Sequence, residues 1–208
     1  MGMILQLAPL RDVTIERLVA DPPLVWQLVM PDEPEFYERL RREAIARSRP
    51  GLLSRLFGGA RAPDPPPPEP EPLALADGEG VMVDVDKAWH GIHYLLTGSA
   101  WQGEPPLDFL VNGGREVGSE DVGYGTARVF TASETRAIAG AVDRLSDDEL
   151  RSRFSPDDMM AKEIYPEIWD RDPDDDDTLG YLIEHLGTLR ETVATAVRNG
   201  HGLIVLVS

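Results

Sequence analysis

The chain has 208 residues, of which 42% are hydrophobic, so it is long and apolar enough to fold as one domain with a sizeable core. It contains no cysteine, which excludes disulfide bonds and thiolate metal sites. The formal net charge of -17 argues against general nucleic-acid binding, because the phosphates would be repelled. No signal-like stretch and no apolar stretch of about 18 residues is present, so we expect a soluble cytoplasmic protein.

The charge is distributed unevenly along the chain. Residues 143–184 hold 15 acidic and 5 basic residues, whereas residues 36–61 hold 7 arginines and 2 acidic residues. The arginines lie among apolar side chains in an amphipathic pattern, which is typical either of an arm for a membrane surface or partner, or of a surface helix. We favour the surface helix, with its arginines facing water or the acidic half of the chain, and we expect no membrane contact.

The N-terminal part of the chain predicts short elements followed by a spacer. Residues 1–10 predict a strand, and residues 13–19 and 22–29 predict short helices separated by prolines. Residues 58–80 are low in complexity and rich in proline. They predict an extended linker or loop that interrupts the single domain.

Residues 84–98 have the strongest helical periodicity in the chain. Six apolar side chains share one arc of roughly 120°, the width of a helix face that packs on a core. They are Val85, Ala88, Trp89, Ile92, Leu95 and Leu96. Asp84 is suited to cap the N-terminus of this helix, and Gly98 is suited to end it in a left-handed conformation.

A line of polar residues borders the apolar arc of this helix. It consists of Asp86, His90, His93 and Thr97. Because the line lies beside the buried face and not opposite to it, we expect a half-buried row that lines a pocket. In one interpretation His90 and His93 act as acid and base, with Asp86 orienting one imidazole. In the other, which we favour, the two histidines are structural and bond to backbone or carboxylate groups.

Five further residues are candidates to contact a ligand beside this helix: Trp89, Tyr124, Arg128, Glu163 and Tyr165. Arg128 is the one cation between residues 123 and 130. It predicts either contact with an anionic ligand or, as we favour, an ion pair with a neighbouring carboxylate. Tyr165 is suited to form a pocket wall, although aromatic residues beside proline more often lie at the edge of a core.

A run of aspartates gives only weak evidence for a metal site. Asp172, Asp174 and Asp176 have the spacing of the first calcium-loop ligands, but Asp177 stands where that loop needs glycine. The two histidines of the central helix lack a third zinc ligand nearby in sequence. We therefore expect no metal and no cofactor. The run is interpreted as a solvated loop before a helix, whose dipole favours acidic residues.

The C-terminal part predicts strands and helices in alternation. Residues 123–130 predict a turn and a strand, and the capping box at 131–134 begins a helix. Residues 178–198 predict a long helix, and the apolar run at 203–207 predicts a buried strand beside the N-terminal one. The order of elements predicts an α+β fold, a helix-rich single domain over a small mixed sheet that includes both chain termini.

Several of these segments resemble a known family. They are the opening Met-Gly-Met, the run Asp84-Val-Asp-Lys-Ala-Trp-His-Gly-Ile-His-Tyr-Leu-Leu-Thr-Gly98, Gly123-Tyr-Gly-x-Ala-Arg128 with its 131–134 cap, and Glu163-Ile-Tyr-Pro166. Together they are similar to the YfbM-like family of bacterial domains of unknown function, over almost the full chain except the proline-rich segment. The family pattern often has proline where this chain has Thr126. The resemblance implies a single α+β domain in a bacterial cytoplasm, and it brings no established activity or catalytic residues.

Two classes of function fit these observations. The first, which we favour, is a non-catalytic binding or accessory protein of the immunity-protein kind. It would engage a basic protein partner, or a small anionic ligand in a pocket beside the 84–98 helix. The second is a hydrolase or group transferase in which His90 and His93 act with Asp86 and Arg128. The sequence predicts no oligomeric state.

Overall fold

The computed structural model describes residues 2–33, 35–40, 42 and 72–208. These residues fall into two units, the larger combining Met1–Pro22 with Leu75–Ser208 and the smaller covering Pro23–Ala74. The predicted basic segment and the first part of the predicted proline-rich linker lie largely outside the described residues.

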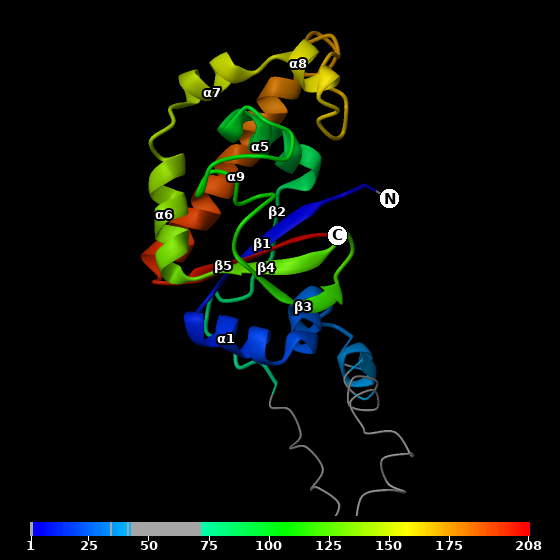
Figure 1. The fold of residues 1–208 in the computed structure, drawn as a ribbon, viewed down its shortest axis with the longest axis vertical. Helices are drawn as coiled ribbons and strands as arrows, with labels where there is room; N and C mark the ends of the chain where they lie inside the picture. The colour runs from blue at the N-terminus through cyan, green and yellow to red at the C-terminus, as the bar shows by residue number, and fades with distance from the viewer. Residues whose placement is uncertain (1, 34, 41, 43–71) are drawn as a thin grey trace, which may run out of the picture. The chain divides into compact units, whose positions relative to one another are not determined.

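The chain contains both strands and helices (Figure 1). The strands are β1 (Leu5–Leu10), β2 (Val83–Asp84), β3 (Arg115–Asp121), β4 (Thr126–Phe130) and β5 (Gly202–Val207). The helices are α1 (Asp12–Ala20), α2 (Trp26–Val29), α5 (Trp89–Thr97), α6 (Ala132–Val142), α7 (Asp147–Arg153), α8 (Pro156–Ala161) and α9 (Thr178–Arg198). Two short 3-10 helices are η1 (Pro22–Val25) and η2 (Asp86–Ala88). None of the described helices is both long and apolar enough to cross a membrane.

The strands form one sheet in the order β2-β1-β5-β4-β3. The strand near the N-terminus lies beside the strand near the C-terminus, as predicted, with Leu5 opposite Val207 and Leu10 opposite Gly202. The prediction of a mixed sheet is corrected, because each pair of neighbouring strands in the described sheet is antiparallel. A tight turn joins β3 to β4, and β5 enters between β1 and β4 antiparallel to both.

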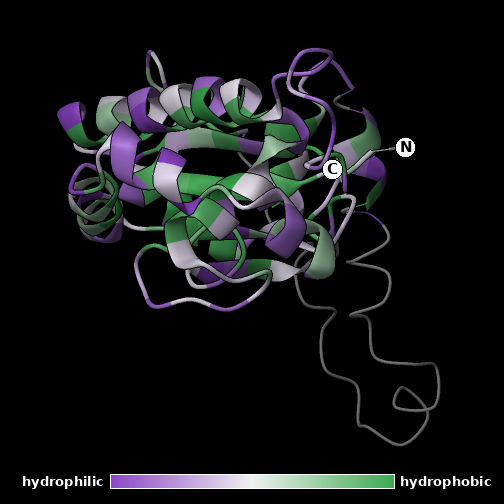
Figure 2. Cartoon of the chain, turned by 90° about the horizontal axis from the view of Figure 1, so that it is seen from above, coloured by the Kyte–Doolittle hydropathy of each residue, from purple (hydrophilic) through white to green (hydrophobic). Residues whose placement is uncertain are grey.

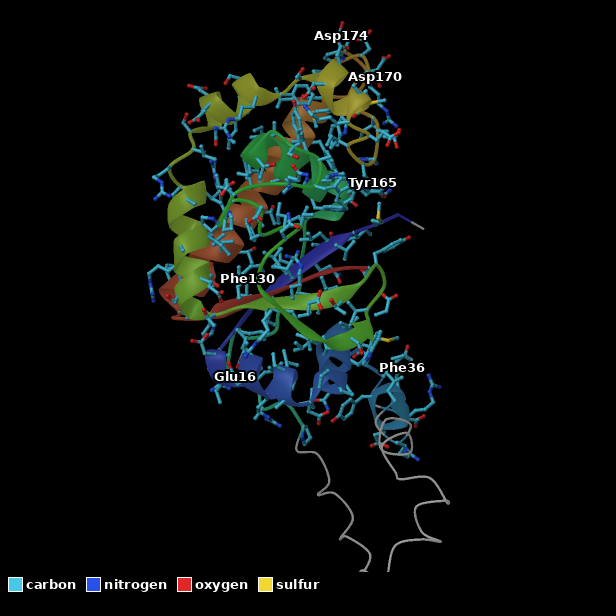
Figure 3. All side chains as sticks on the ribbon, viewed as in Figure 1. Glu16, Phe36, Phe130, Tyr165, Asp170 and Asp174 are labelled. Carbon is cyan, nitrogen blue, oxygen red and sulfur yellow. The ribbon has the colours of Figure 1, made fainter. Side chains whose placement is uncertain are left out.

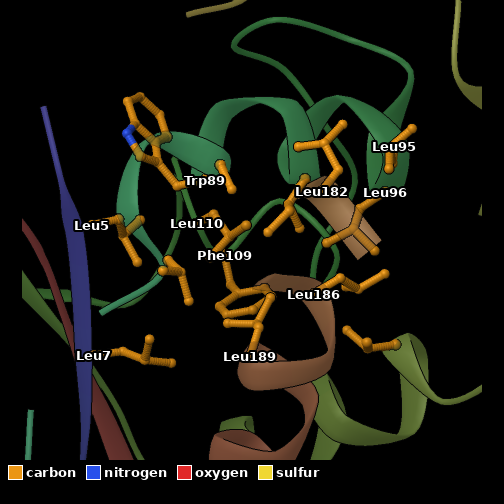
Figure 4. Close-up of a cluster of buried hydrophobic side chains, with 14 of the residues drawn as sticks. Leu5, Leu7, Trp89, Leu95, Leu96, Phe109, Leu110, Leu182, Leu186 and Leu189 are labelled. Atoms are coloured by element: carbon orange, nitrogen blue, oxygen red, sulfur yellow. The ribbon is translucent and has the colours of Figure 1, made fainter. Parts of the chain in front are cut away.

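Helices cover both faces of the sheet in the larger unit. Helices α5, α6 and α9 lie on one face and α1 on the other (Figure 1). Leu5 and Leu7 of β1 join Leu186 and Leu189 of α9 in one apolar core, which Figure 4 shows between α5, α9 and the sheet. Because β5 is covered on both sides, it is apolar at each position from 203 to 207, and the middle of the unit is accordingly hydrophobic (Figure 2).

The helix predicted at 84–98 begins later than expected. Its first residues form β2 and η2, and α5 begins at Trp89. Asp84 does not cap α5, since its Oδ1 accepts from the backbone N–H of Asp86 at 2.5 Å. Asp86 has a φ of 48°, so the chain turns before α5 and Asp86 is not on the same α-helix as the two histidines.

Helix α5 packs closely against α9 and ends where predicted. Gly98 has a φ of 75°, and its N–H donates to the carbonyl of Tyr94 at 2.7 Å. Gly91 faces the neighbouring elements: a Cβ there would lie 2.6 Å from Leu182 Cδ2 and 2.8 Å from the ring of Trp169. The missing side chain therefore allows α5 to approach α9 and the 164–169 segment.

The predicted helix starts of the C-terminal half are confirmed. The Thr131 side chain accepts from the N–H of Glu134, whose carboxylate in turn bonds the N–H of Thr131, which completes the capping box of α6. A similar cap begins α7: the Ser146 side chain accepts from the N–H of Glu149 at 3.2 Å. Helix α9 has the bounds that the apolar period predicted.

Strand β3 was not predicted, because only one of its seven residues is large and apolar. That residue, Val117, is fully buried, whereas Arg115 and Glu116 are exposed. β3 lies at the edge of the sheet and pairs only with β4. Charged side chains suit such an edge because they discourage pairing with a further strand.

The last residues of the predicted linker are fixed by a buried carboxylate. Glu79 accepts from the backbone N–H of Arg11 at 2.9 Å, from its Nε at 2.8 Å, and from the N–H of Ala76 at 2.9 Å. Burial raises the pKa of Glu79, but these hydrogen bonds outweigh that effect and lower it. Residues 76–80 are therefore an anchored loop in the larger unit.

The smaller unit is described only in part. It contains α2 and a helical stretch at 35–40. The rings of Trp26 and Phe36 meet edge to face, with centroids 4.9 Å apart. The N–H of Leu73 donates to Gln27 Oε1 at 2.9 Å, which ties the end of this unit to α2.

Candidate functional site

His90 is fully buried, and both of its ring nitrogens bond to backbone groups. Nδ1 accepts from the N–H of Tyr165 at 3.0 Å, and Nε2 lies 2.7 Å from the carbonyl of Ala100. Because Nδ1 accepts, the proton of the neutral ring belongs on Nε2, which donates to Ala100. Burial lowers the pKa of His90, against the opposing effect of the Ala100 bond. His90 thus joins α5 to two loops and holds no free nitrogen.

The ring of His90 also lies between two tryptophans. It is stacked on Trp89 with centroids 4.9 Å apart and planes at 14°, and its centroid is 4.3 Å from that of Trp101. Trp89 is 3% exposed, and its Nε1–H donates to the carbonyl of Met3 at 3.2 Å. Trp101 is 55% exposed. An aromatic row therefore runs from the core to the surface.

His93 is fully buried. Among the described residues, neither ring nitrogen has a partner of hydrogen-bond geometry. Burial lowers the pKa of His93 to about 4, His90 and Arg128 act in the same direction, and the nearby backbone of Gln102 opposes them. The prediction of a half-buried row that lines a pocket is therefore wrong for His90 and His93. Close packing buries both histidines completely.

Asp86 does not orient either histidine. Its Oδ2 accepts from the hydroxyl of Tyr181 on α9 at 2.9 Å. Burial raises the pKa of Tyr181, and the bond to Asp86 adds to this shift. The carboxylate of Asp86 is thus bonded to α9, and the predicted Asp86–imidazole pair does not form.

Arg128 anchors the loop at 99–114 by binding its carbonyl groups. Nη1 donates to the carbonyls of Phe109 at 3.0 Å, Asn112 at 2.5 Å and Gly113 at 3.2 Å, and Nη2 donates to that of Leu110 at 2.7 Å. No carboxylate of the described residues lies within ion-pair distance, so the favoured ion pair is not found. Backbone carbonyls that have no partner within their own turn bind Arg128 in place of a carboxylate.

Arg128 nevertheless remains charged at neutral pH. Burial lowers its pKa to about 10, while Asp108 and Glu116 raise it. Carbonyl oxygens carry only partial charges. The guanidinium is thus held rigidly, and its positive charge is not fully neutralised by a directly bonded carboxylate.

A cavity of about 220 Å³ lies between the start of α5, the 99–112 loop and strands β4 and β5. Its walls include the aromatic residues Trp89, Trp101 and Tyr124 together with Arg128 and Thr126. Arg128 and Thr126 are two positions apart on β4 and so point to the same face of the sheet. Of the five predicted ligand contacts, the structure brings together Trp89, Tyr124 and Arg128. We call this the aromatic cavity.

The other two predicted contacts do not line the aromatic cavity. Tyr165 lies above the sheet in Figure 3. Its hydroxyl accepts from the N–H of Met3 at 2.9 Å, and its ring centroid lies 6.2 Å from that of Trp89. Tyr165 therefore ties its loop to the residues before β1. Glu163 is exposed with a φ of 53°, in the turn that follows α8.

Sequence reasoning missed Trp101 and Thr126 as cavity residues. Trp101 follows the end of α5 in a loop without any apolar period, where the carbonyl of Trp101 accepts from Asn112 Nδ2 at 2.8 Å. A lone tryptophan among glycines and prolines was the available signal. Thr126 pairs with Asp121 of β3. Because β3 was not predicted, the position of Thr126 in the sheet could not be predicted either.

The aspartate-rich loop serves its own fold. Asp172 Oδ1 accepts from the N–H of Asp174 at 3.0 Å, and Asp177 caps α9 by accepting from the N–H of Gly180 at 2.7 Å. Within the described residues, no group of three or more His, Cys, Asp or Glu is arranged to hold a metal ion. Figure 3 places Asp174 beside α8, away from the sheet.

The fold and this cavity define an α+β protein whose antiparallel sheet carries an aromatic-lined pocket beside its central strands. The family model described as Domain of unknown function (DUF1877) matches residues 1–206, so the chain belongs to that family. The crystal structure of a protein of unknown function, YfbM from Escherichia coli, is similar over 99% of both chains, with a TM-score of 0.58 and 18% sequence identity. This likeness concerns the fold alone. No curated protein matches the chain.

Proposed function

We propose that this chain is a non-catalytic binding protein that holds a small molecule in the aromatic cavity. The observation that carries the proposal is the exposure of two large aromatic side chains at that cavity, 55% for Trp101 and 51% for Tyr124. Exposed aromatics beside a concave and largely apolar space are typical of ligand-binding sites. Arg128 supplies the fixed polar group that such sites use to orient a ligand.

The positions of the histidines favour binding over the alternative of a hydrolase or group transferase. A general base must come within hydrogen-bond reach of the proton that it removes. Both nitrogens of His90 are engaged by backbone, and the aromatic cavity is lined by neither His90 nor His93. Catalysis by this pair would require α5 to separate from its packed neighbours.

We also propose that the protein acts in a bacterial cytoplasm. The cysteine-free composition suits a reducing compartment, and the similar solved structure comes from a bacterium. Cell fractionation with an antibody to the native chain tests this location. Recovery of the protein from the periplasm or medium would contradict it.

A basic protein is the second candidate partner, on the acidic surface at 143–184. Ion pairs among the described residues engage only four of its 15 acids, namely Asp147, Glu149, Asp158 and Asp176. A contact of this kind would be strongly screened by salt. Titration with a purified basic protein at rising salt therefore tests this partner. Binding to the acidic surface should weaken as the salt concentration rises.

A fragment screen on the full chain tests the proposed function. Small aromatic and aliphatic compounds are added, and tryptophan fluorescence and thermal melting are recorded. Hits should bind about tenfold more weakly to Trp101→Ala, because one stacking wall is lost. Val13→Ala is the matched control, since Val13 is 58% exposed on α1 at the other face of the sheet.

Two results of this screen contradict the proposal. Hits that bind equally to Trp101→Ala place the ligand outside the aromatic cavity. Chemical conversion of a hit, seen by mass spectrometry and lost in His90→Gln, would restore the enzyme alternative.

A further inference from the structure

The polar groups on the wall of the aromatic cavity favour an anion. Arg128 is the only side chain in the lining that is charged at neutral pH, and Tyr124 and Thr126 add hydroxyl donors. The lining contains no Asp or Glu, although the chain as a whole carries a net charge of -17. A cavity with one positive group in an acidic protein is a distinct local environment, because charge interactions there are less screened than on the surface.

The bonds of Arg128 leave one edge of its guanidinium available. All four carbonyl contacts use the terminal nitrogens Nη1 and Nη2. The Nε–H makes no hydrogen bond to any of the described residues. A carboxylate can bind the edge formed by Nε and one Nη with two parallel hydrogen bonds. Because the loop carbonyls already hold Arg128 in place, little side-chain freedom is lost when a ligand binds.

The size and walls of the cavity limit the ligand to about one ring. A cavity of about 150 Å³ accepts benzene, whereas pockets for drug-sized ligands start at about 300 Å³. The aromatic cavity, at about 220 Å³, lies between these values. It therefore has room for a single ring with a carboxylate and is too small to enclose a nucleotide. Trp89, Trp101 and Tyr124 offer ring faces and edges on which a flat ligand can stack.

We propose that the aromatic cavity binds a single-ring aromatic monocarboxylate, with the ring between the tryptophans and Tyr124 and the carboxylate on the Nε edge of Arg128. This inference rests on the proposed function and specifies the ligand of the same site. The carboxylate accepts from a group that no other described side chain neutralises by direct contact. The ring covers the exposed faces of Trp101 and Tyr124.

The test compares four probes on the full chain by calorimetry: benzoate, the neutral benzamide, the cationic benzylamine and the larger adenosine monophosphate. Benzoate should bind about tenfold or more tightly than benzamide, since a charge-assisted pair replaces a neutral hydrogen bond. Benzylamine and the nucleotide should not bind measurably. The advantage of benzoate over benzamide should shrink as salt is raised.

Variants locate the binding. Trp101→Ala should weaken benzoate about tenfold through the lost stacking face, and Val13→Ala should leave it unchanged. Arg128→Lys keeps the charge but cannot present a two-pronged edge, so it should reduce the preference for benzoate over benzamide. A circular dichroism spectrum and a melt of Arg128→Lys establish that the loop remains folded.

The outcomes separate the ligand class from the proposed function. Equal binding of benzamide and benzoate, both weakened by Trp101→Ala, overturns the carboxylate and leaves a binding cavity. Benzoate binding that ignores Trp101→Ala overturns the site itself. If none of the four probes binds, the monocarboxylate proposal fails, and the fragment screen alone decides the proposed function.

Discussion

The buried face of α5 and the opening of the aromatic cavity both contain aromatic side chains, but these side chains differ in their exposure to solvent. On α5, His90 is 0% exposed, and its polar atoms are satisfied by the backbone of two loops. At the cavity, Trp101 and Tyr124 expose more than half of their surface. The two regions meet at the ring of His90, whose centroid lies 4.3 Å from that of Trp101 in a tilted arrangement. The comparison teaches that accessibility, and not residue type, separates the proposed binding residues from the structural ones.

The largest expected effect belongs to the buried side of this comparison. Trp89→Ala removes a side chain that is 3% exposed, stacks on His90 and bonds the carbonyl of Met3. We expect a loss of about 3 to 5 kcal/mol in the free energy of unfolding and little soluble protein. Urea denaturation measures it. A variant that unfolds at the same urea concentration as the unchanged chain would show that Trp89 does not contribute to the core.

The pH dependence of His93 is the next effect. Its pKa falls from 6.5 to about 4 on folding, so the unfolded chain takes up the proton first as the pH drops. Its stabilising contribution, about 3 kcal/mol by linkage, is complete above pH 6.5 and is lost as the pH falls towards 4. The lowered pKa of His90 acts in the same direction.

The variant His93→Leu isolates this contribution from that of other groups. Urea melts from neutral to acid pH should show a flatter loss of stability for His93→Leu than for the unchanged chain. His185→Gln, at a partly exposed position of α9, is the control and should follow the unchanged chain. Parallel curves of stability against pH for all three proteins would indicate that His93 is accessible to solvent and not buried.

A smaller loss is expected for His90→Gln. Glutamine cannot bond both Ala100 and Tyr165 from this position and cannot stack on the tryptophans, so the free energy of unfolding should fall by about 1 to 3 kcal/mol. Thermal melting measures the change, with His185→Gln again as the control. The same variant should also shift the fluorescence of Trp101, because its ring loses a neighbour. An unchanged melt together with lost benzoate binding would reverse the assignment of His90.

The smallest stability effect is expected at the cavity mouth. Trp101→Ala and Tyr124→Ala alter exposed side chains, so each should change the free energy of unfolding by no more than about 0.5 kcal/mol. Their effect on ligand affinity should be much larger. Melts and calorimetry on the same samples compare the two. Strong destabilisation by either variant would mean that the aromatic cavity is part of the core.

The sequence predicted the elements whose local signals agree with their final packing. The capping box at 131–134, the apolar stripe of α9 and the left-handed stop at Gly98 each carry their own physical cause and were found as expected. β3 was missed because an edge strand buries only Val117 and shows no alternation. The early part of the 84–98 helix was misassigned because the strained turn at Asp86 leaves no mark on helical periodicity.

The candidate site was predictable only in part, for a geometric reason. Trp89, Tyr124 and Arg128 were singled out from three different segments, and the fold brings them to one cavity. Trp101 was missed because its place depends on carbonyl bonds to Arg128 and on the ring of His90, which are long-range contacts. Helical periodicity predicts on which face of its helix a residue lies, but not how deeply a neighbouring loop buries it. His90 and His93 were therefore expected to be more exposed than they are.

The central position of β5 has a consequence for the order of folding. It separates β1 from β4, and the backbones of Ile4 and Ser208 exchange hydrogen bonds at 2.8 and 2.9 Å across almost the whole sequence. During synthesis β1 leaves the ribosome early and waits for residues 202–207 with an unpaired inner edge. Such long-range pairing is slow and leaves edges open to aggregation. Since Val205 and Val207 line the aromatic cavity, that cavity is complete only after the sheet has closed. The proposed ligand would therefore stabilise only chains in which β5 is already paired.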